Sequence, residues 1–207
     1  MKIIVGLGNH GKEYEGTRHN AGFFAIDALL KEKELCVENE NELHFDKKFN
    51  AEICQVSTKG EKVIFVKPNT FMNLSGEAVN KILQFYKAGI GQLIVYHDDI
   101  DIPVGHAQIK LKGGSAGHNG IQNIIDTLGS DGFIRVRIGI LPINGGEQVV
   151  EKVDGPIDTK DFVLSKFSDR EKKIIDSAID IANEYILNFI GSKEPIKATT
   201  LSTKMSD

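Results

Sequence analysis

The chain has 207 residues, of which 41% are hydrophobic and 26% charged, a composition that allows one large folded domain and excludes a disordered or collagen-like chain. Its formal net charge of −4 excludes a strongly basic surface overall, so any contact with nucleic acid has to come from a local basic patch. No apolar run approaches the roughly 20 residues that a membrane span needs. Cys36 and Cys54 lack metal-binding spacing, and we expect two reduced, buried thiols in a cytoplasmic protein.

Apolar runs and alternating patterns predict strands along most of the chain. They cover residues 2–7, 49–57, 62–67, 92–97, 107–112 and 133–140. Apolar residues at helical spacing predict helices between these strands. They cover residues 21–35, 74–87, 119–128 and 170–190. Thr58–Glu61 predicts a hairpin turn, Asp98–Asp101 an acidic turn, and residues 143–160 a polar loop.

The alternation of strands and helices predicts a single α/β domain over residues 1–190. We expect a twisted mixed β-sheet flanked by helices, because the hairpin makes part of the sheet antiparallel. Residues 191–207 are polar and follow the last predicted helix. We expect this tail to be disordered.

The segment Gly6–Gly11 follows the first predicted strand and matches the GxGxxG fingerprint of dinucleotide-binding folds. That fingerprint needs a helix to begin at its third glycine, so that the helix N-terminus can hold a pyrophosphate. Residues 12–20 contain Gly16 and show no apolar periodicity, so the next helix begins too late. A nucleotide-binding oxidoreductase is therefore a minor hypothesis. We expect the glycines to form tight turns that bring Asn9 close to a substrate.

Polar loops follow or flank the predicted strands, and such loops converge on one crevice in an open α/β sheet. Their polar residues are Asn9, Tyr14, Arg18, His19, Asn20, Asn69, Asn73, His97, Asp98, Asp99, His118 and Asn119. The set lacks a serine or cysteine arranged as a nucleophile. A histidine held by a carboxylate can take a proton from water, and side-chain amides can stabilise an oxyanion. These residue types predict hydrolysis of an activated acyl bond by direct attack of water.

The loops also carry longer motifs that resemble those of the bacterial peptidyl-tRNA hydrolases. The matching segments are Gly6–Asn9, Tyr14, Thr17–Gly22, Lys67–Gly76, His97–Asp101, Gly117–Gly120, Arg135–Ile140 and Phe162–Phe167. The resemblance covers nearly the whole chain. It implies the fold of that family and hydrolysis of the ester bond that joins a peptide to the 3′ end of tRNA. It implies binding of the acceptor stem and 3′ end of peptidyl-tRNA. We expect a monomeric protein with no cofactor and no metal.

The resemblance further implies roles for individual residues. His19 matches the general base, and Asp98 matches the acid that supports it. Asn9 matches a residue that helps to distinguish peptidyl-tRNA from aminoacyl-tRNA. Asn73 matches the amide that positions the substrate carbonyl and helps to stabilise its oxyanion. The positions that line the site of the tRNA 3′ end, or that contact substrate or water, are Tyr14, Phe71 and Asn119.

Basic residues recur at alternating positions around two of the predicted strands. Lys110 and Lys112 belong to one strand, and Arg135 and Arg137 belong to the other. A solvated sheet edge is one interpretation of this pattern. A phosphate-binding patch for the tRNA acceptor stem is the other, and the resemblance favours it, with Lys110, Arg135 and Arg137 as the candidates.

Other polar residues of these loops have simpler interpretations. His97 and His118 lie at the ends of predicted elements, and we expect structural roles for both. Asp99 and Asp101 are expected to be turn formers or caps. The acidic cluster could suggest Mg²⁺, but neighbouring residues of an extended chain point to opposite sides, so we expect no metal site.

A non-catalytic RNA-binding protein is the second functional hypothesis, because plant organelle splicing factors share this fold and much of this sequence. His19, Asp98, Asn9 and Asn73 are all present, however. Binding alone would not require a base and its acid partner. The sequence therefore favours the enzyme.

Overall fold

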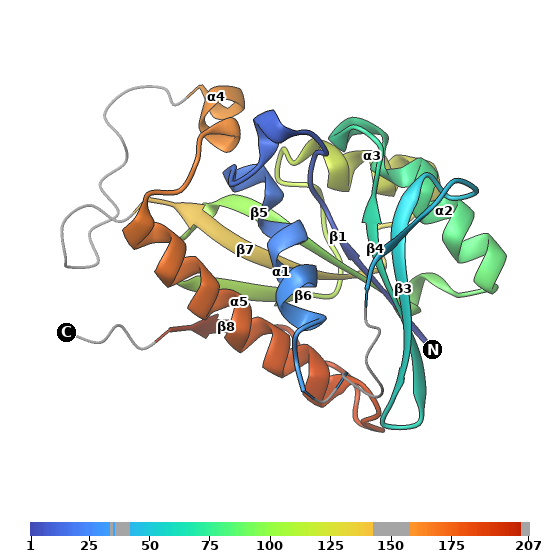
Figure 1. Cartoon of the computed structure of the whole chain (residues 1–207). Helices are drawn as coiled ribbons and strands as arrows, with labels where there is room; N and C mark the ends of the chain where they lie inside the picture. Colours follow the sequence, from blue (N-terminus) through green and yellow to red (C-terminus); the bar gives the residue numbers. More distant parts are fainter. Residues whose placement is uncertain (34, 36–41, 143–157, 204–207) are drawn as a thin grey trace.

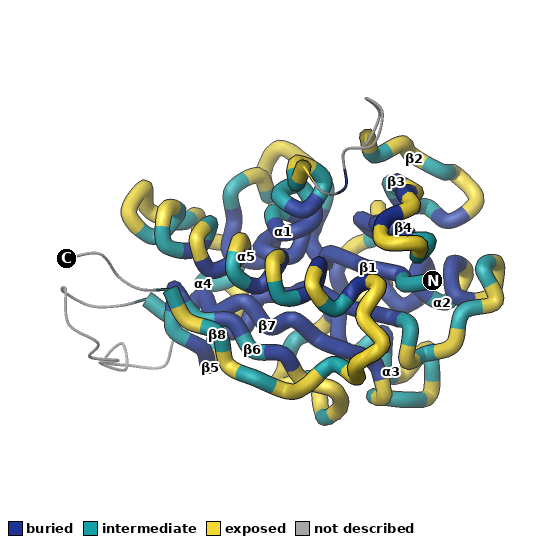
Figure 2. The backbone as a smooth tube through the Cα atoms, turned by 90° about the horizontal axis from the view of Figure 1, so that it is seen from below, coloured by how far each residue is buried: buried dark blue, intermediate teal, exposed yellow. Residues whose placement is uncertain are grey.

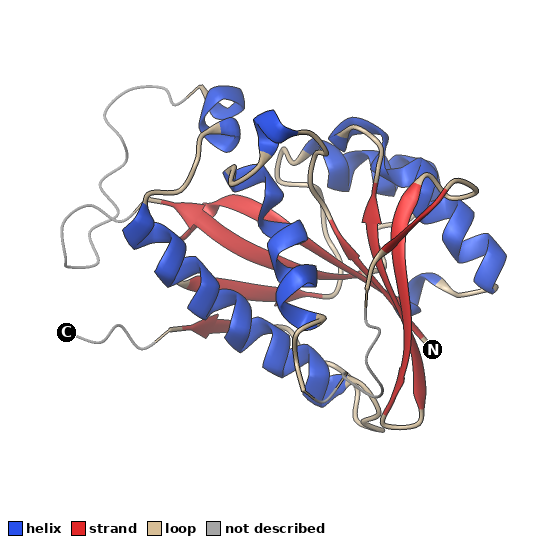
Figure 3. Ribbon diagram, viewed as in Figure 1, coloured by secondary structure: helices blue, strands red, loops and turns tan. Residues whose placement is uncertain are grey.

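The computed structural model describes residues 1–33, 35, 42–142 and 158–203. These residues form one mixed eight-stranded β-sheet with helices on its two faces (Figure 1, Figure 3). The predicted α/β class is therefore confirmed. The strands lie in the order β2-β3-β4-β1-β5-β7-β6-β8. Within the described part of the chain, no helix has the length and apolar character needed to cross a membrane.

The centre of the sheet is parallel, and its outer strands pair in antiparallel fashion. The strands are β1 Lys2–Gly6, β2 His44–Asp46, β3 Ala51–Thr58, β4 Glu61–Pro68, β5 Leu93–Pro103, β6 His106–Lys110, β7 Ile134–Leu141 and β8 Thr199–Ser202. Continuous apolar runs form the parallel centre because its strands are buried on both faces. Ile3, Ile4 and Val5 of β1 are all fully buried. β3 and β4 pair as the predicted hairpin.

Helices α1 and α5 cover one face of the sheet, and α2 and α3 cover the other (Figure 2). The helices are α1 Ala21–Leu29, α2 Ser75–Tyr86, α3 Asn119–Leu128, α4 Thr159–Leu164 and α5 Asp169–Phe189, with 3-10 turns η1 Lys12–Tyr14, η2 Arg18–Asn20, η3 Met72–Leu74 and η4 Ile90–Gln92. Each face buries its own hydrophobic core. α1 ends earlier than predicted because the charged segment Lys31–Lys33 offers no further apolar position.

The acidic segment Asp98–Asp101 is part of strand β5, so the prediction of a turn there is wrong. Asp98 pairs with Ile138 and Asp99 pairs with Gly139 of β7, and the register shifts only after Asp99. The strand continues because β7 offers backbone partners beyond the apolar run Leu93–Tyr96, and the local sequence does not reveal these partners.

The predictions for the C-terminal third also need correction. The segment predicted as a loop over residues 143–160 includes the start of α4 at Thr159, whereas residues 143–157 lie outside the described part. The tail is not disordered over Thr199–Ser202, because β8 pairs with the edge of β6. An unpaired strand edge presents free N–H and C=O groups that a polar segment can satisfy. Cys54 is buried with a free thiol, as expected, and Cys36 lies outside the described residues.

Helix α1 approaches the sheet most closely at Gly22. A Cβ atom added there would lie 2.4 Å from the backbone nitrogen of Leu7 and 2.4 Å from the carbonyl oxygen of Tyr96. Both atoms belong to the central backbone and cannot move aside. Because His19 lies three residues before Gly22, the same contact holds His19 close to the end of β1 and to Asp98 of β5.

We predict that Gly22→Ala lowers the free energy of unfolding by about 1–3 kcal/mol, the usual cost of overpacking, with the upper end expected because the neighbours are backbone atoms. Urea unfolding measures the change. Gly91→Ala is the matched control, since nothing lies within 4 Å of a Cβ added at Gly91. Equal stability of the two variants would contradict the close approach.

Candidate active site

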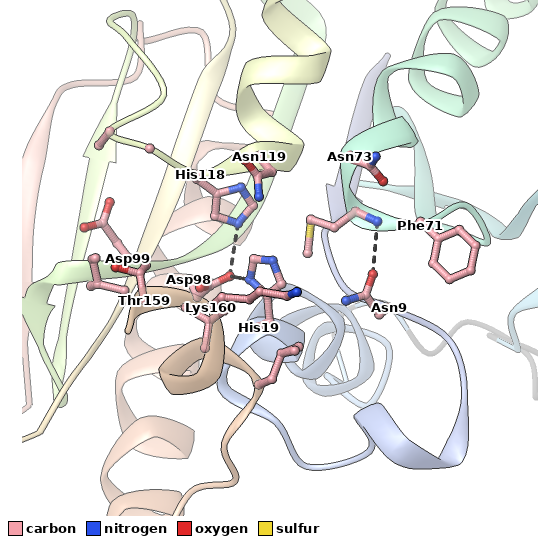
Figure 4. Close-up of a pocket in the computed structure, with 16 residues that line it drawn as sticks. Asn9, His19, Phe71, Asn73, Asp98, Asp99, His118, Asn119, Thr159 and Lys160 are labelled. Atoms are coloured by element: carbon pink, nitrogen blue, oxygen red, sulfur yellow. Dashed lines mark hydrogen bonds and ion pairs between the residues drawn. The ribbon is translucent and has the colours of Figure 1, made fainter. Parts of the chain in front are cut away.

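A cavity of about 690 Å³ opens where the parallel strands end. The segments that follow β1 and β4 meet Asp98–Ile100 of β5 there, and the start of α3 and helix α4 complete its wall (Figure 4). Its polar lining residues are Asn9, His19, Asn73, Asp98, Asp99, His118, Asn119, Thr159 and Lys160. Loops that lie far apart in the sequence therefore converge, as the positions of the strand ends predict.

His19 and Asp98 form a buried pair at the base of this cavity. The 3-10 turn η2 carries His19, and its imidazole Nδ1 donates a hydrogen bond to Asp98 Oδ1 over 2.9 Å. This bond leaves Nε2 as the proton acceptor of the ring. Arg18 of the same turn holds it in place, because its guanidinium donates hydrogen bonds to Glu171 at 2.9 Å and to Ser165 at 3.1 Å.

His118 donates the second hydrogen bond to Asp98. It is the N-cap of α3, where its Nδ1 accepts the backbone N–H groups of Gly120 at 3.1 Å and Ile121 at 3.2 Å. Because Nδ1 is used as an acceptor, the proton of the ring sits on Nε2. That Nε2 lies 3.0 Å from Asp98 Oδ1 and donates to it. The helix cap therefore fixes the tautomer that supports the carboxylate.

The electrostatics of the pair suit a base that works near neutral pH. Burial by itself would lower the pKa of His19, but the charge of Asp98 and the hydrogen bond to it outweigh burial and raise this pKa above 6.5. Burial by itself would raise the pKa of Asp98, but the contacts with His19 and His118 hold that pKa far below its usual range. Asp98 is thus ionised throughout the neutral range and favours the imidazolium form of His19.

Asn9 presents a hydrogen-bond donor to the cavity. Its Oδ1 accepts the backbone N–H of Met72 over 3.0 Å, and its own backbone N–H donates to Asn20 Oδ1 over 2.8 Å. The Nδ2 of Asn20 donates back to the Asn9 carbonyl over 3.0 Å. The oxygen and the backbone of Asn9 are fixed in this way, while its NH₂ group has no hydrogen-bond partner among the described residues and can donate to a ligand.

One side of the cavity is apolar and accessible. Phe71 is 66% exposed and stands at the rim beside the amide of Asn73 (Figure 4). Ile100, Val163 and Leu164 line the cavity on its other side. The exposed Phe71 ring at the mouth of a polar site offers a surface for stacking.

Asp99 faces away from His19 and holds Arg137. Its Oδ2 accepts from the guanidinium Nε of Arg137 over 2.5 Å, and Arg137 also donates to Gln108 over 3.0 Å. Arg135 donates to the carbonyl of Gly114 over 2.7 Å. Both arginines are buried, because β7 lies inside the sheet. The interpretation of these two arginines as a solvated sheet edge is therefore wrong, and their phosphate-binding role stays a prediction.

His19, Asp98 and His118 each offer one atom that could bind a metal ion, and these three atoms lie within 4.8 Å of one another. They make up the candidate metal-binding group among the described residues. Each of these atoms already takes part in the hydrogen bonds to Asp98 Oδ1. The same three side chains thus form a hydrogen-bonded network centred on Asp98 Oδ1. Asp99 and Asp98 point to different partners, as expected for neighbours on a strand.

The model of the peptidyl-tRNA hydrolase family matches residues 3–206 of this sequence. The chain belongs to this family. A peptidyl-tRNA hydrolase from Caldanaerobacter subterraneus subsp. tengcongensis is 46% identical over 190 residues, which cover 92% of this chain and 93% of the relative. One from Geobacillus kaustophilus is 43% identical and covers 86% of this chain and 87% of the relative. The crystal structure of a peptidyl-tRNA hydrolase from Acinetobacter baumannii matches with a TM-score of 0.75 and 32% identity, and the match covers 92% of this chain and 88% of that chain.

Six of the residues that the family resemblance singled out line the cavity together: Asn9, His19, Phe71, Asn73, Asp98 and Asn119. Four others do not line it: Tyr14, Lys110, Arg135 and Arg137. Tyr14 is half-buried on η1, and Lys110 is exposed at the end of β6.

Sequence reasoning missed two residues of the site. His118 was predicted to be structural, but it both caps α3 and donates to Asp98. Its place within the motif Gly117–Gly120 was the available signal. Lys160 was hidden in a segment predicted to be a loop, and no local pattern marks it. His97 does have the predicted structural role: it is buried, its Nδ1 donates to the Asp98 carbonyl over 2.7 Å, and burial keeps its pKa well below the usual range.

We predict that Asp98→Asn shifts the acid limb of the pH–activity profile of this family member to lower pH. Without the carboxylate charge, burial dominates and lowers the pKa of His19, so the base remains neutral further into the acid range. The plateau rate should fall as well, because the imidazolium loses its stabilising charge. The measurement is kcat/KM against pH, with Asp101→Asn, an exposed acid of the same strand, as the control. An unchanged profile for Asp98→Asn would show that Asp98 is only structural.

Proposed function

We propose that the protein hydrolyses the ester bond that joins a peptide to the 3′ end of tRNA, and that a water activated by His19 is the nucleophile. The observation that carries this proposal is the His19–Asp98 pair, 2.9 Å apart and buried at the base of an open cavity. Among the described residues that line the cavity there is no serine or cysteine. A water molecule is therefore the attacking group that the site favours.

In the proposed mechanism the water oxygen attacks the ester carbonyl carbon while His19 Nε2 takes a proton from it. Asp98 stabilises the imidazolium that forms. The amides of Asn73 and Asn119 line the same cavity and can donate hydrogen bonds to the tetrahedral oxyanion. The bond to the 3′ oxygen of the ribose then breaks, and that oxygen takes the proton back from His19. The scheme balances without a cofactor or a metal ion.

Asn9 gives the proposed site a means of selecting its substrate. Its free NH₂ group is a donor, and the amide carbonyl next to the ester in a peptidyl or N-blocked group is an acceptor. A free aminoacyl group carries an ammonium there instead, which has only donors. Two hydrogen-bond donors cannot pair with each other, so a bound aminoacyl-tRNA would leave the Asn9 NH₂ group and its own ammonium without acceptors.

The nucleic-acid part of the substrate needs a wider surface than the cavity. The exposed ring of Phe71 can stack on the terminal base, an interaction that is typical of single-stranded nucleic-acid sites. We assign the binding of the acceptor stem to Lys110, which is exposed at the end of β6. Arg135 and Arg137 hold the neighbouring loop and Asp99, so they shape this surface from within.

We predict that the purified protein releases the acyl group from N-acetyl-aminoacyl-tRNA much faster than from free aminoacyl-tRNA. His19→Ala should lower the rate on the blocked substrate by about 10²–10⁴, the usual value of a general base. His44→Ala, which changes an exposed histidine, is the control, and circular dichroism reports on folding. Activity of His19→Ala within a few-fold of the wild type would remove His19 as the base. A wild type without activity would favour the RNA-binding alternative.

We also predict that Asn9→Asp narrows the discrimination between the two substrates. The new carboxylate can still accept the Met72 N–H, but it replaces the donor with an anionic acceptor that favours the free ammonium. The ratio of kcat/KM values should shrink by roughly tenfold to a hundredfold, the range for one hydrogen bond to a charged group. Asn69→Asp, an exposed residue of the nearby β4–η3 segment, is the control. An unchanged ratio for Asn9→Asp would contradict the assignment.

A further inference from the structure

Lys160 brings a positive charge to the cavity that the proposed mechanism does not use. It belongs to the first turn of α4 and lines the cavity with Thr159, Val163 and Leu164. In Figure 4 its side chain extends from α4 across the site, toward the side where His19 and Asn9 lie. Within the described ranges, its ammonium has no ion pair or hydrogen bond with another side chain.

The carboxylates that line the cavity already have partners among the described residues. Asp98 accepts from His19 and His118, and Asp99 is paired with Arg137. Lys160 therefore adds to the cavity a cation that has no ion-pair partner among the described residues. A charge in that position is complementary to an anionic group of a ligand.

The position of Lys160 is tied to that of His19. The carbonyl of Ser165, directly after α4, accepts the backbone N–H of Arg18 over 3.0 Å, and the Arg18 guanidinium stacks on the Phe162 ring with 4.8 Å to the centroid. Arg18 is the residue next to His19. Contacts between α4 and η2 thus set the distance between the Lys160 ammonium and the His19 imidazole. A single ligand can contact both groups.

We propose that Lys160 binds the phosphodiester group that joins the last two nucleotides of the tRNA, an inference that rests on the proposed function. The phosphate is the anion that every tRNA substrate carries next to the reacting ester. Peptides vary in charge, so a fixed cation in the peptide subsite would favour some sequences over others. A lysine ammonium is a compact point charge suited to a phosphate. Lys160 would then set the depth to which the 3′ end enters.

The test compares three ester substrates that carry the same N-acetyl-aminoacyl group: a full tRNA, the trinucleotide CCA, and adenosine without any phosphate. Lys160→Gln should raise KM roughly tenfold for the tRNA and for the trinucleotide. This is the lower end of the loss of affinity expected when one hydrogen bond to a charged group is removed. It should leave kcat/KM for the adenosine ester unchanged. The salt dependence of the trinucleotide reaction should also weaken, by about 0.7 in the slope of log kcat/KM against log salt.

Three further variants sharpen the outcome. Lys160→Arg keeps the charge and should restore most of the lost affinity. Lys81→Gln removes an exposed lysine of α2 that does not line the cavity and should change none of the three reactions. Lys110→Gln should affect the full tRNA alone, since Lys110 is assigned to the acceptor stem.

Two results would overturn the proposal. Equal losses of kcat on all three substrates, the adenosine ester included, would place Lys160 at the oxyanion rather than at a phosphate. No change with any substrate would leave Lys160 without a role in binding. A failure of the proposed function itself looks different, because the wild type would then hydrolyse none of the three esters.

Discussion

The active site depends on one carboxylate oxygen. Asp98 Oδ1 accepts hydrogen bonds from His19 at 2.9 Å and from His118 at 3.0 Å. Asp98 is only 2% exposed. An ionised carboxylate is stable in such a place only when donors satisfy it. The same bonds orient both imidazoles. The charge of Asp98, the tautomer of His118 and the basicity of His19 are therefore consequences of a single arrangement.

Three distant parts of the chain have to meet within a few ångströms to make that arrangement. The sheet order places β1 next to β5, so that the segment after β1 brings His19 beside Asp98. The N-cap of α3 supplies His118 from a third segment, and its two backbone donors hold the ring in place. The close contact of Gly22 with Leu7, directly after β1, and with Tyr96 of β5 holds α1 tightly against the sheet. Precise packing at the centre of the fold is thus what permits a buried polar network at its edge.

Charge compensation around the cavity explains how an acidic protein can present a site for an anionic substrate. Asp99 is neutralised by Arg137, and Glu171 is neutralised by Arg18. These pairs are structural and keep the arginines away from solvent. The formal charge of −4 therefore says little about the field inside the cavity, where Lys160 is a lining cation without an ion-pair partner among the described residues.

The sequence by itself determined the fold class, the hairpin and most helices, because continuous apolar runs and helical periodicity are local properties. It also pointed to His19, Asp98, Asn9 and Asn73, since these residues lie within long motifs. Only the tertiary structure decided which basic residues stay exposed, because the burial of Arg135 and Arg137 depends on partners from other segments. It also decided the dual role of His118, the extension of β5 and the pairing of β8 with β6. Each of these features is a hydrogen-bond partnership between segments far apart in the chain, and local patterns carry no information about such partners.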